Sequence, residues 1–177
     1  MTRTSAGILL YRLREGSVEV LLVHPGGPFF GRKDLGHWSI PKGEVDGADA
    51  DSLDTAKREF REEVGHPVPP GSLIELGSIV QRGGKTVYAW AVEGDIDPAT
   101  MSSNLIEFEW PPFSGRKKSF GEVDKWVYYG PADAREHIKE TQIPLLDRLD
   151  AALASQAALA SQAALAALAD PTERPPR

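Results

Sequence analysis

The first part of the chain alternates between short apolar runs and polar turns. Residues 6–11 and 18–24 are apolar, β-favouring runs separated by the polar residues REGS, a pattern that predicts a β-hairpin. Residues 24–37 are rich in Gly, Pro and charge and predict a long surface loop, a kind of segment that often carries function. A short strand over residues 37–41 is expected to follow this loop.

The apolar period changes to that of a helix after residue 50. The spacing predicts one amphipathic helix with Asp51 or Ser52 as its N-cap and Gly65 as its end. Its apolar face comprises Leu53, Ala56, Phe60 and Val64.

The rest of the domain continues with strands. Residues 73–81 and 86–92 predict a second hairpin around RGGK. A Pro-rich stretch of mixed charge begins at residue 107, and a strand at 126–129 and a helix from near Ala132 follow it. Strands around isolated helices predict an α+β fold, an α/β/α sandwich with a mixed sheet.

The C-terminal residues 150–177 differ in composition from the domain predicted for residues 1–149. AALASQ occurs twice, at 151–156 and 157–162, and AALAAL follows, so this Ala-rich tail has high helix propensity. A period of six rotates successive leucines by about 120° around a helix, which gives no fixed partner face. We therefore expect a protruding or loosely packed helix that frays at DPTERPPR, with a homodimer as the alternative.

Composition restricts the chemistry. The 177 residues are 41% hydrophobic, enough for the core of one domain, and contain no cysteine, which excludes disulfides and thiolate chemistry. Lys and Arg total 20 against 26 Asp and Glu, so a nucleic-acid polymer is not expected as a partner. The apolar run near the N-terminus is broken by Arg12 and Arg14 and is too short for a signal peptide or membrane span. We expect a cytoplasmic protein without a membrane partner.

The predicted helix carries three carboxylates on one face. Glu59, Glu62 and Glu63 fall within an arc of about 100°, and their i,i+3 and i,i+4 spacings make them repel one another. A divalent cation such as Mg²⁺ or Mn²⁺ would turn this repulsion into binding, because hard ions prefer oxygen ligands and bridge to phosphates. The alternative is a solvated face on which Arg58 and Arg61 offset Glu62 and Glu63.

The surroundings of these acids resemble the Nudix box, G-x5-E-x7-R-E-U-x-E-E-x-G-U with U an apolar residue. Residues 58–65 read REFREEVG and match the second half at every fixed position, and residues 38–44 read WSIPKGE. The resemblance covers about residues 3–148 and leaves the Ala-rich tail outside it.

The resemblance implies a Nudix hydrolase that uses Mg²⁺ or Mn²⁺. In this family a metal-activated water attacks a phosphorus of a nucleoside diphosphate linked to another group, here a nucleoside triphosphate or a dinucleoside polyphosphate. The alternative is a catalytically silent Nudix-fold protein that senses a nucleotide. Arg58 would orient the acids of the helix. The implied metal ligands and catalytic acids are the Gly43 carbonyl, Glu59, Glu62, Glu63 and Glu122.

The first half of the box departs from the pattern. Fourteen residues separate Gly43 from Arg58, where the family has thirteen, and the extra one lies in the loop DGADAD before the helix. Asp49, or Asp51, is the candidate for the missing first Glu, and His66 occupies the final apolar position.

A further acid from outside the box often completes the site in this family. Glu122, shortly before the predicted strand at 126–129, is the first candidate, and Glu107 and Glu109 are its rivals. For each of them the alternative is an exposed surface acid.

Basic and aromatic residues supply candidates for substrate binding. The candidates for phosphate contacts are Arg32, Lys33, Lys42, Arg116, Lys117 and Lys118. His24 and His37 flank the long loop and are expected to be structural. A base-stacking platform, or alternatively core packing, is expected of Phe29, Phe30, Trp38, Tyr88, Trp90 and Trp110.

Overall fold

The computed structural model describes residues 3–46 and 51–169, and its centre is a mixed six-stranded sheet. The strand order is β4-β5-β1-β2-β8, and β3 pairs with β1 beside β2. β1 and β5 are parallel, while the other pairs are antiparallel. The strands are β1 (Thr4–Arg14), β2 (Ser17–Pro25), β3 (Lys42–Glu44), β4 (Ile74–Val80), β5 (Thr86–Glu93) and β8 (Val123–Tyr129).

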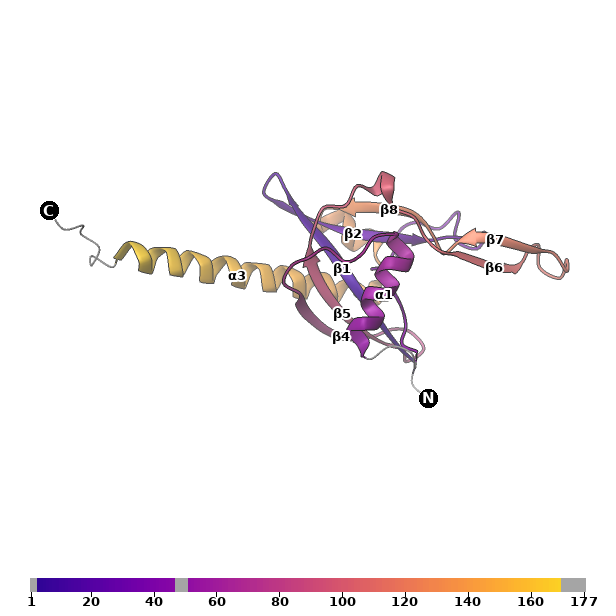
Figure 1. The fold of residues 1–177 in the computed structure, drawn as a ribbon, viewed down its shortest axis with the longest axis horizontal. Coiled ribbons are helices and arrows are strands. Elements are labelled where there is room, and N and C mark those ends of the chain that lie inside the picture. The colour runs from indigo at the N-terminus through magenta and orange to yellow at the C-terminus, as the bar shows by residue number, and fades with distance from the viewer. Residues whose placement is uncertain (1–2, 47–50, 170–177) are drawn as a thin grey trace.

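Helices cover both faces of this sheet (Figure 1). α1 (Ser52–Val64) packs on one face, and α2 (Pro131–His137) and the first turns of α3 (Ile143–Ala169) pack on the other. Short 3₁₀ turns at Pro98–Thr100 and Glu140–Gln142 complete the connections. The predicted α/β/α sandwich with a mixed sheet is confirmed.

The alternation of side chains along β1 explains why this strand is apolar throughout. Ala6, Ile8 and Leu10 point to the α1 side, whereas Leu9 and Tyr11 point to the side of α2 and α3. Because both faces are covered, all five are buried. Burial of each large apolar side chain contributes about 1.5–3 kcal/mol.

The ends of α1 follow from local capping. The Asp51 side chain accepts a hydrogen bond from the Asp54 N–H at 2.9 Å, so Asp51 is the N-cap. Gly65 has φ 79° and its N–H donates to the Arg61 carbonyl. A Cβ at Gly65 would also overlap the Ser102 hydroxyl, so glycine is required here for space as well as conformation. The predicted start and end of the helix are confirmed.

Three details differ from the sequence-based expectation. The strand expected at 37–41 is reduced to isolated bridges, and the regular pairing begins at Lys42. β8 begins at Val123 instead of 126. A further hairpin, β6 (Leu105–Glu109) with β7 (Lys117–Gly121), occupies the Pro-rich stretch and projects from the domain (Figure 1).

Aromatic contacts stabilise the projecting hairpin, and the sequence pattern did not predict them. Phe108 stacks on Phe120 across the two strands with ring centroids 4.7 Å apart, and Phe29 of the long loop stacks on Phe108 at 5.8 Å. The strands are short and four of their ten residues are charged, so the pattern that predicts strands is weak in this stretch.

The Ala-rich tail continues α3, which already begins at Ile143. Leu145, Leu146 and Leu149 are buried in the core, whereas residues 154–168 are exposed. Figure 1 shows the helix leaving the domain on the side opposite to the β6–β7 hairpin. The expected protruding helix is confirmed for the residues described, and DPTERPPR lies beyond them.

Residues Glu140–Leu168 form a stretch of helix long and apolar enough to cross a membrane by length and composition alone, with mean hydropathy 1.4. The first turns of α3 pack on the sheet, however, and only residues 154–168 leave the domain. At about 1.5 Å per residue this segment is about 23 Å long, and the hydrocarbon core of a bilayer is about 30 Å thick. The exposed segment alone is therefore short for a membrane span.

Deletion of residues 157–177 is expected to leave the domain intact. The deleted side chains make no core contacts in the part that the structure describes, so the melting temperature should change by less than about 2 °C. Leu145→Ala, at a fully buried position of the same helix, should cost about 2–5 kcal/mol. Thermal unfolding followed by circular dichroism measures both. A drop of more than about 5 °C on truncation would show that the tail packs in solution.

Candidate active site

A cavity of about 310 Å³ opens where α1, β3 and the start of β8 meet. Four carboxylates line it, from Glu44 on β3, from Glu59 and Glu63 on α1 and from Glu122 just before β8. Three lysines line it as well, and they come from β3, from the β4–β5 turn and from the segment after α2. These are Lys42, Lys85 and Lys139. Acids and bases thus share one cavity, an arrangement suited to a metal-bound polyanion.

Gly43 allows α1 to approach β3. A Cβ built on Gly43 would overlap the carboxylate of Glu59, and Glu59 is only 8% exposed. The motif therefore requires glycine at position 43 for steric reasons, because any side chain there would displace the Glu59 carboxylate. Gly7 on the neighbouring strand β1 has a similar role, since a Cβ there would overlap the Pro41 carbonyl.

Burial raises the pKa of both buried acids of α1. Burial raises the pKa of Glu63 to about 8, although the Lys42 charge nearby and the Lys42 backbone N–H, which donates to Oε2 at 3.1 Å, oppose this. Burial also raises the pKa of Glu59, although Arg58 opposes it. Buried carboxylates side by side favour a bound cation, because a cation offsets both their desolvation and their repulsion.

Arg58 joins the acids of the helix to one another. Its guanidinium donates to Glu59 Oε1 at 2.7 Å and to Glu62 Oε2 at 3.2 Å, and it also reaches the Glu44 carbonyl at 3.3 Å. This is the orienting contact that the resemblance implied. Glu62 is half-buried and held at the edge by Arg58, and it does not line the cavity.

Backbone hydrogen bonds position Glu122 beside the cavity. The Asn104 N–H donates to the Glu62 carbonyl at 3.0 Å, and the Glu122 N–H donates to the Asn104 carbonyl at 2.9 Å. Glu122 is thus tied to the last turn of α1. The rivals lie on the projecting hairpin, where Glu107 accepts from the Ser119 hydroxyl and Glu109 from the Gly115 N–H. Of the three candidates, the structure brings only Glu122 to the cavity.

The donors of this cavity fit a hard cation in chemistry, because they are carboxylates and carbonyls. Within residues 3–46 and 51–169, however, no group of three acidic or histidine side chains already converges on one ion position. Asp49, the first candidate for the missing Glu of the box, lies outside the residues described. Asp51 caps α1.

Two of the cavity lysines were not expected from the sequence. Lys85 pairs with Glu44 at 2.9 Å, and the Lys139 N–H donates to the Trp38 carbonyl at 2.9 Å. Burial lowers the pKa of Lys139 and also that of Lys42. Neither Lys85 nor Lys139 belongs to a motif, so only strand pairing and helix packing reveal them.

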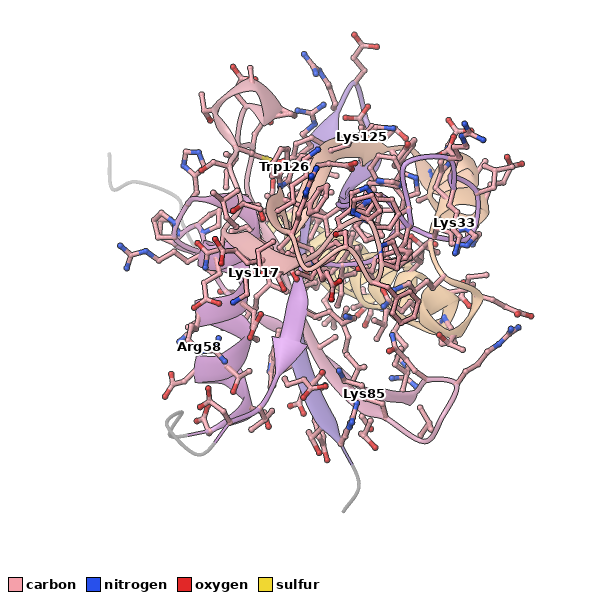
Figure 2. All side chains as sticks on the ribbon, turned by 90° about the vertical axis from the view of Figure 1, so that its right-hand side faces the viewer. Lys33, Arg58, Lys85, Lys117, Lys125 and Trp126 are labelled. Carbon is pink, nitrogen blue, oxygen red and sulfur yellow. The ribbon has the colours of Figure 1, made fainter. Side chains whose placement is uncertain are left out.

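Most of the predicted phosphate contacts lie elsewhere. Lys42 lines the cavity, whereas Arg32, Lys33 and residues 116–118 do not. The Lys33 ammonium lies over the Phe30 ring, and that of Lys118 over the Phe120 ring. Figure 2 looks onto the hairpin end of the molecule, with Arg58 and Lys85 below and Lys33 and Lys117 well apart, so these cations form no single cluster.

The aromatic and histidine candidates divide between core and hairpin. Trp38 is buried, and Trp90 packs against the α1 side of the core. Phe29 and Trp110 contact each other beside the turn that joins β6 to β7. His24 is fully buried between Asp124 and the Lys33 carbonyl, and so holds the long loop to β8. Core packing thus accounts for Trp38 and Trp90.

Trp126 on β8 fixes the end of α1 that carries Glu63. Its indole N–H donates to the Glu63 carbonyl at 2.7 Å. Trp126→Phe should lower the free energy of unfolding by about 1–3 kcal/mol, because a carbonyl loses its donor and the packing is incomplete. Trp110→Phe on the hairpin is the matched control and should cost about 0.5 kcal/mol or less. Urea denaturation measures both, and equal effects would contradict the anchoring role.

Comparison with known proteins agrees with this geometry. A family model described as NUDIX domain matches residues 1–149, so the chain belongs to the Nudix family. No curated protein matches the sequence.

Similar solved structures share the fold at low identity. They include the NUDIX domain of Shewanella oneidensis NrtR complexed with ADP ribose, with TM-score 0.62, 17% identity, and 86% of this chain and 89% of that chain covered. A C. elegans Ap4A hydrolase has TM-score 0.59, 22% identity and coverages of 87% and 99%. Shewanella oneidensis NrtR complexed with a 27mer DNA has TM-score 0.57, 17% identity and coverages of 87% and 63%.

Proposed function

We propose that this protein is a divalent-metal-dependent hydrolase that cleaves a phosphoanhydride bond in a nucleoside triphosphate or a dinucleoside polyphosphate. The observation that carries the proposal is the pairing of buried Glu59 and Glu63 with Lys42, Lys85 and Lys139 in one cavity. Carboxylates suit the metal, and lysines suit the phosphates that the metal would bridge.

Each residue has a role that follows from its position. Glu59, Glu63 and Glu122, with the Gly43 carbonyl, would hold Mg²⁺ or Mn²⁺, which supplies Lewis acidity and lowers the pKa of a bound water. Arg58 keeps Glu59 and Glu62 in orientation through its two hydrogen bonds. The three lysines bind and orient the phosphate chain and offset its charge, which also stabilises charge in the transition state.

The test is release of phosphate or nucleoside monophosphate from a panel of nucleotides with Mg²⁺, with Mn²⁺ and with chelator. We expect turnover that needs the metal and that falls at least about 100-fold in Glu59→Gln and Glu63→Gln. Equal activity of these variants and the wild type would contradict the site assignment. Turnover of Asp49→Ala shows whether Asp49 replaces the missing first Glu of the box. Unchanged turnover would show that it does not.

A catalytically silent nucleotide sensor is the second candidate. Two observations favour it: in the described part of the chain no three acids converge on one ion position, and Glu62 lies outside the cavity. Tight nucleotide binding without metal-dependent turnover would decide for the sensor.

A further inference from the structure

His24 is a buried polar side chain that the proposed reaction does not use. It lies near the end of β2 and has no exposed surface. Its Nδ1 lies 2.6 Å from Asp124 Oδ1, and its Nε2 lies 2.7 Å from the Lys33 carbonyl oxygen. A carboxylate and a carbonyl can only accept hydrogen bonds. Each of the two ring nitrogens therefore faces an acceptor.

Only the imidazolium form of His24 satisfies both contacts. A neutral imidazole has one N–H and one lone pair, so in either tautomer a lone pair would face an oxygen lone pair. The ring is fully buried, so solvent does not take the place of the missing donor. Both distances are as short as those of charge-assisted N–H···O bonds, about 2.7–2.9 Å. The buried ring thus carries a positive charge, with the Asp124 carboxylate as its counter-ion.

Charged groups reach the surroundings of the His24 ring from three elements. The Trp38 ring packs edge-on against His24 with centroids 5.0 Å apart, and its indole N–H donates to Asp34 Oδ1 at 2.8 Å. The pKa of Asp34 is lowered mainly by this hydrogen bond and further by nearby positive charges, that of His24 among them. The groups come from β8, from the long loop and from α2: Asp124 and Asp34, which favour a charge on His24, and Lys125 and His137, which oppose it when they are protonated.

The contact between His24 and Asp124 fixes the start of β8, beside Glu122. The pairing of β2 with β8 shifts register just after His24, so the regular ladder does not continue through this end. The His24–Asp124 pair joins the strands here instead. The Gly26 N–H adds a second contact, because it donates to the Glu122 carbonyl at 2.9 Å. A Cβ on Gly26 would overlap the Gly121 carbonyl, so the two backbones approach closely at this point.

We infer that His24 is a positioning residue for the candidate metal site. Its imidazolium form holds the start of β8 through Asp124 and the long loop through the Lys33 carbonyl, and so fixes where Glu122 enters the cavity. When the ring loses its second proton, one of the two hydrogen bonds is lost and Glu122 is held less firmly. The inference rests on the proposed function only in treating Glu122 as a metal ligand, because the state of His24 is measurable without metal.

The state of the ring is tested by two-bond ¹H–¹⁵N correlation spectra of the full chain in chelator, which distinguish an imidazolium from either neutral tautomer. At about pH 6 we expect both His24 nitrogens to carry a proton. The signals are assigned by their loss in His24→Gln. As pH rises, the backbone amide signal of Glu122 should move in parallel with the loss of the second proton, and this movement should be absent in His24→Gln. Asp124→Asn, which removes the counter-ion, should shift the loss of the proton to lower pH.

The effect on the site is measured as the Mn²⁺ affinity of the full chain at one fixed pH by isothermal titration calorimetry. His24→Gln and Asp124→Asn should each lower this affinity about 10-fold, and the double variant should lower it no further. In a Glu122→Gln background, His24→Gln should have no additional effect, whereas a general loss of structure would lower the affinity in both backgrounds. His37→Gln is the matched control and should change nothing, since the His37 ring bonds to the Leu35 carbonyl of its own loop.

Other results overturn the inference. It fails if one His24 nitrogen lacks a proton at about pH 6, or if the Glu122 amide signal does not follow the titration of the ring. It also fails if His24→Gln lowers the Mn²⁺ affinity equally in both backgrounds. If Glu122→Gln binds Mn²⁺ as the wild type does, the proposed metal site fails instead, and the spectra in chelator then decide whether His24 positions Glu122. If His24→Gln does not fold, Asp124→Asn supplies the same comparisons.

Discussion

Glu63→Gln is expected to make the metal-free protein more stable at pH 8.5 and to remove its response to Mg²⁺. Burial raises the pKa of Glu63 from 4.5 to about 8, so the folded state keeps a proton that the unfolded state has already released. Between about pH 4.5 and pH 8 the folded state binds more protons, and the stability of the metal-free protein falls as pH rises. Glutamine keeps the shape and an acceptor for the Lys42 N–H, and it carries no charge.

The size of this effect follows from the same pKa. A difference of one pKa unit between the folded and the unfolded state corresponds to about 1.4 kcal/mol in the free energy of unfolding. Some of the gain is lost because Lys42 loses a nearby negative charge, so we expect about 1–3 kcal/mol at pH 8.5 and almost none at pH 5. Urea denaturation in chelator across this pH range measures it.

The metal arm of the experiment separates this effect from general stabilisation. The wild type should gain about 2.7 kcal/mol at Mg²⁺ concentrations 100 times the dissociation constant, and Glu63→Gln should gain far less. Glu75→Gln, at an exposed glutamate on β4, is the matched control and should behave as the wild type. A Glu63→Gln protein that is less stable than the wild type in chelator at pH 8.5 would contradict the buried-acid account.

Gly43→Ala is expected to lower turnover by about 100-fold or more while leaving the protein folded. The added methyl group would overlap the Glu59 carboxylate, so β3 and α1 must separate or Glu59 must move. A displacement of about 1 Å at a reacting group costs about 100-fold in rate. The strain should lower stability by about 1–3 kcal/mol, which a domain of this size tolerates.

Gly31→Ala is the control for this substitution, because nothing lies within 4 Å of the added Cβ and the backbone there has no positive φ. Steady-state kinetics with Mg²⁺ and thermal unfolding are measured for both variants. Wild-type turnover in Gly43→Ala would show that Glu59 does not need its present position. A similar loss in Gly31→Ala would show that the effect is not specific to the contact with Glu59.

The sequence by itself determined the features that depend on local geometry. The period of apolar residues and the caps placed α1, since helix ends depend on residues a few positions apart. The same period placed Glu59, Glu62 and Glu63 on one arc, and the spacing of Arg58 brought it within reach of two of them. The apolar runs of β1, β2, β4 and β5 were equally visible, because each is buried along its length or alternates.

Only the tertiary structure decided which distant residues share the cavity. Lys85 and Lys139 follow a turn and a short helix with no motif of their own, and strand pairing brings them opposite α1. Glu122, and not Glu107 or Glu109, is the additional acid at the cavity because the last two lie on the β6–β7 hairpin. This hairpin is stabilised by aromatic contacts and projects away from α1. Packing of α1 against β3 also decides that Glu63 is buried and that Glu62 lies outside the cavity. Helical periodicity gives the direction of a side chain around the helix axis, but it does not show how closely the neighbouring strand packs there.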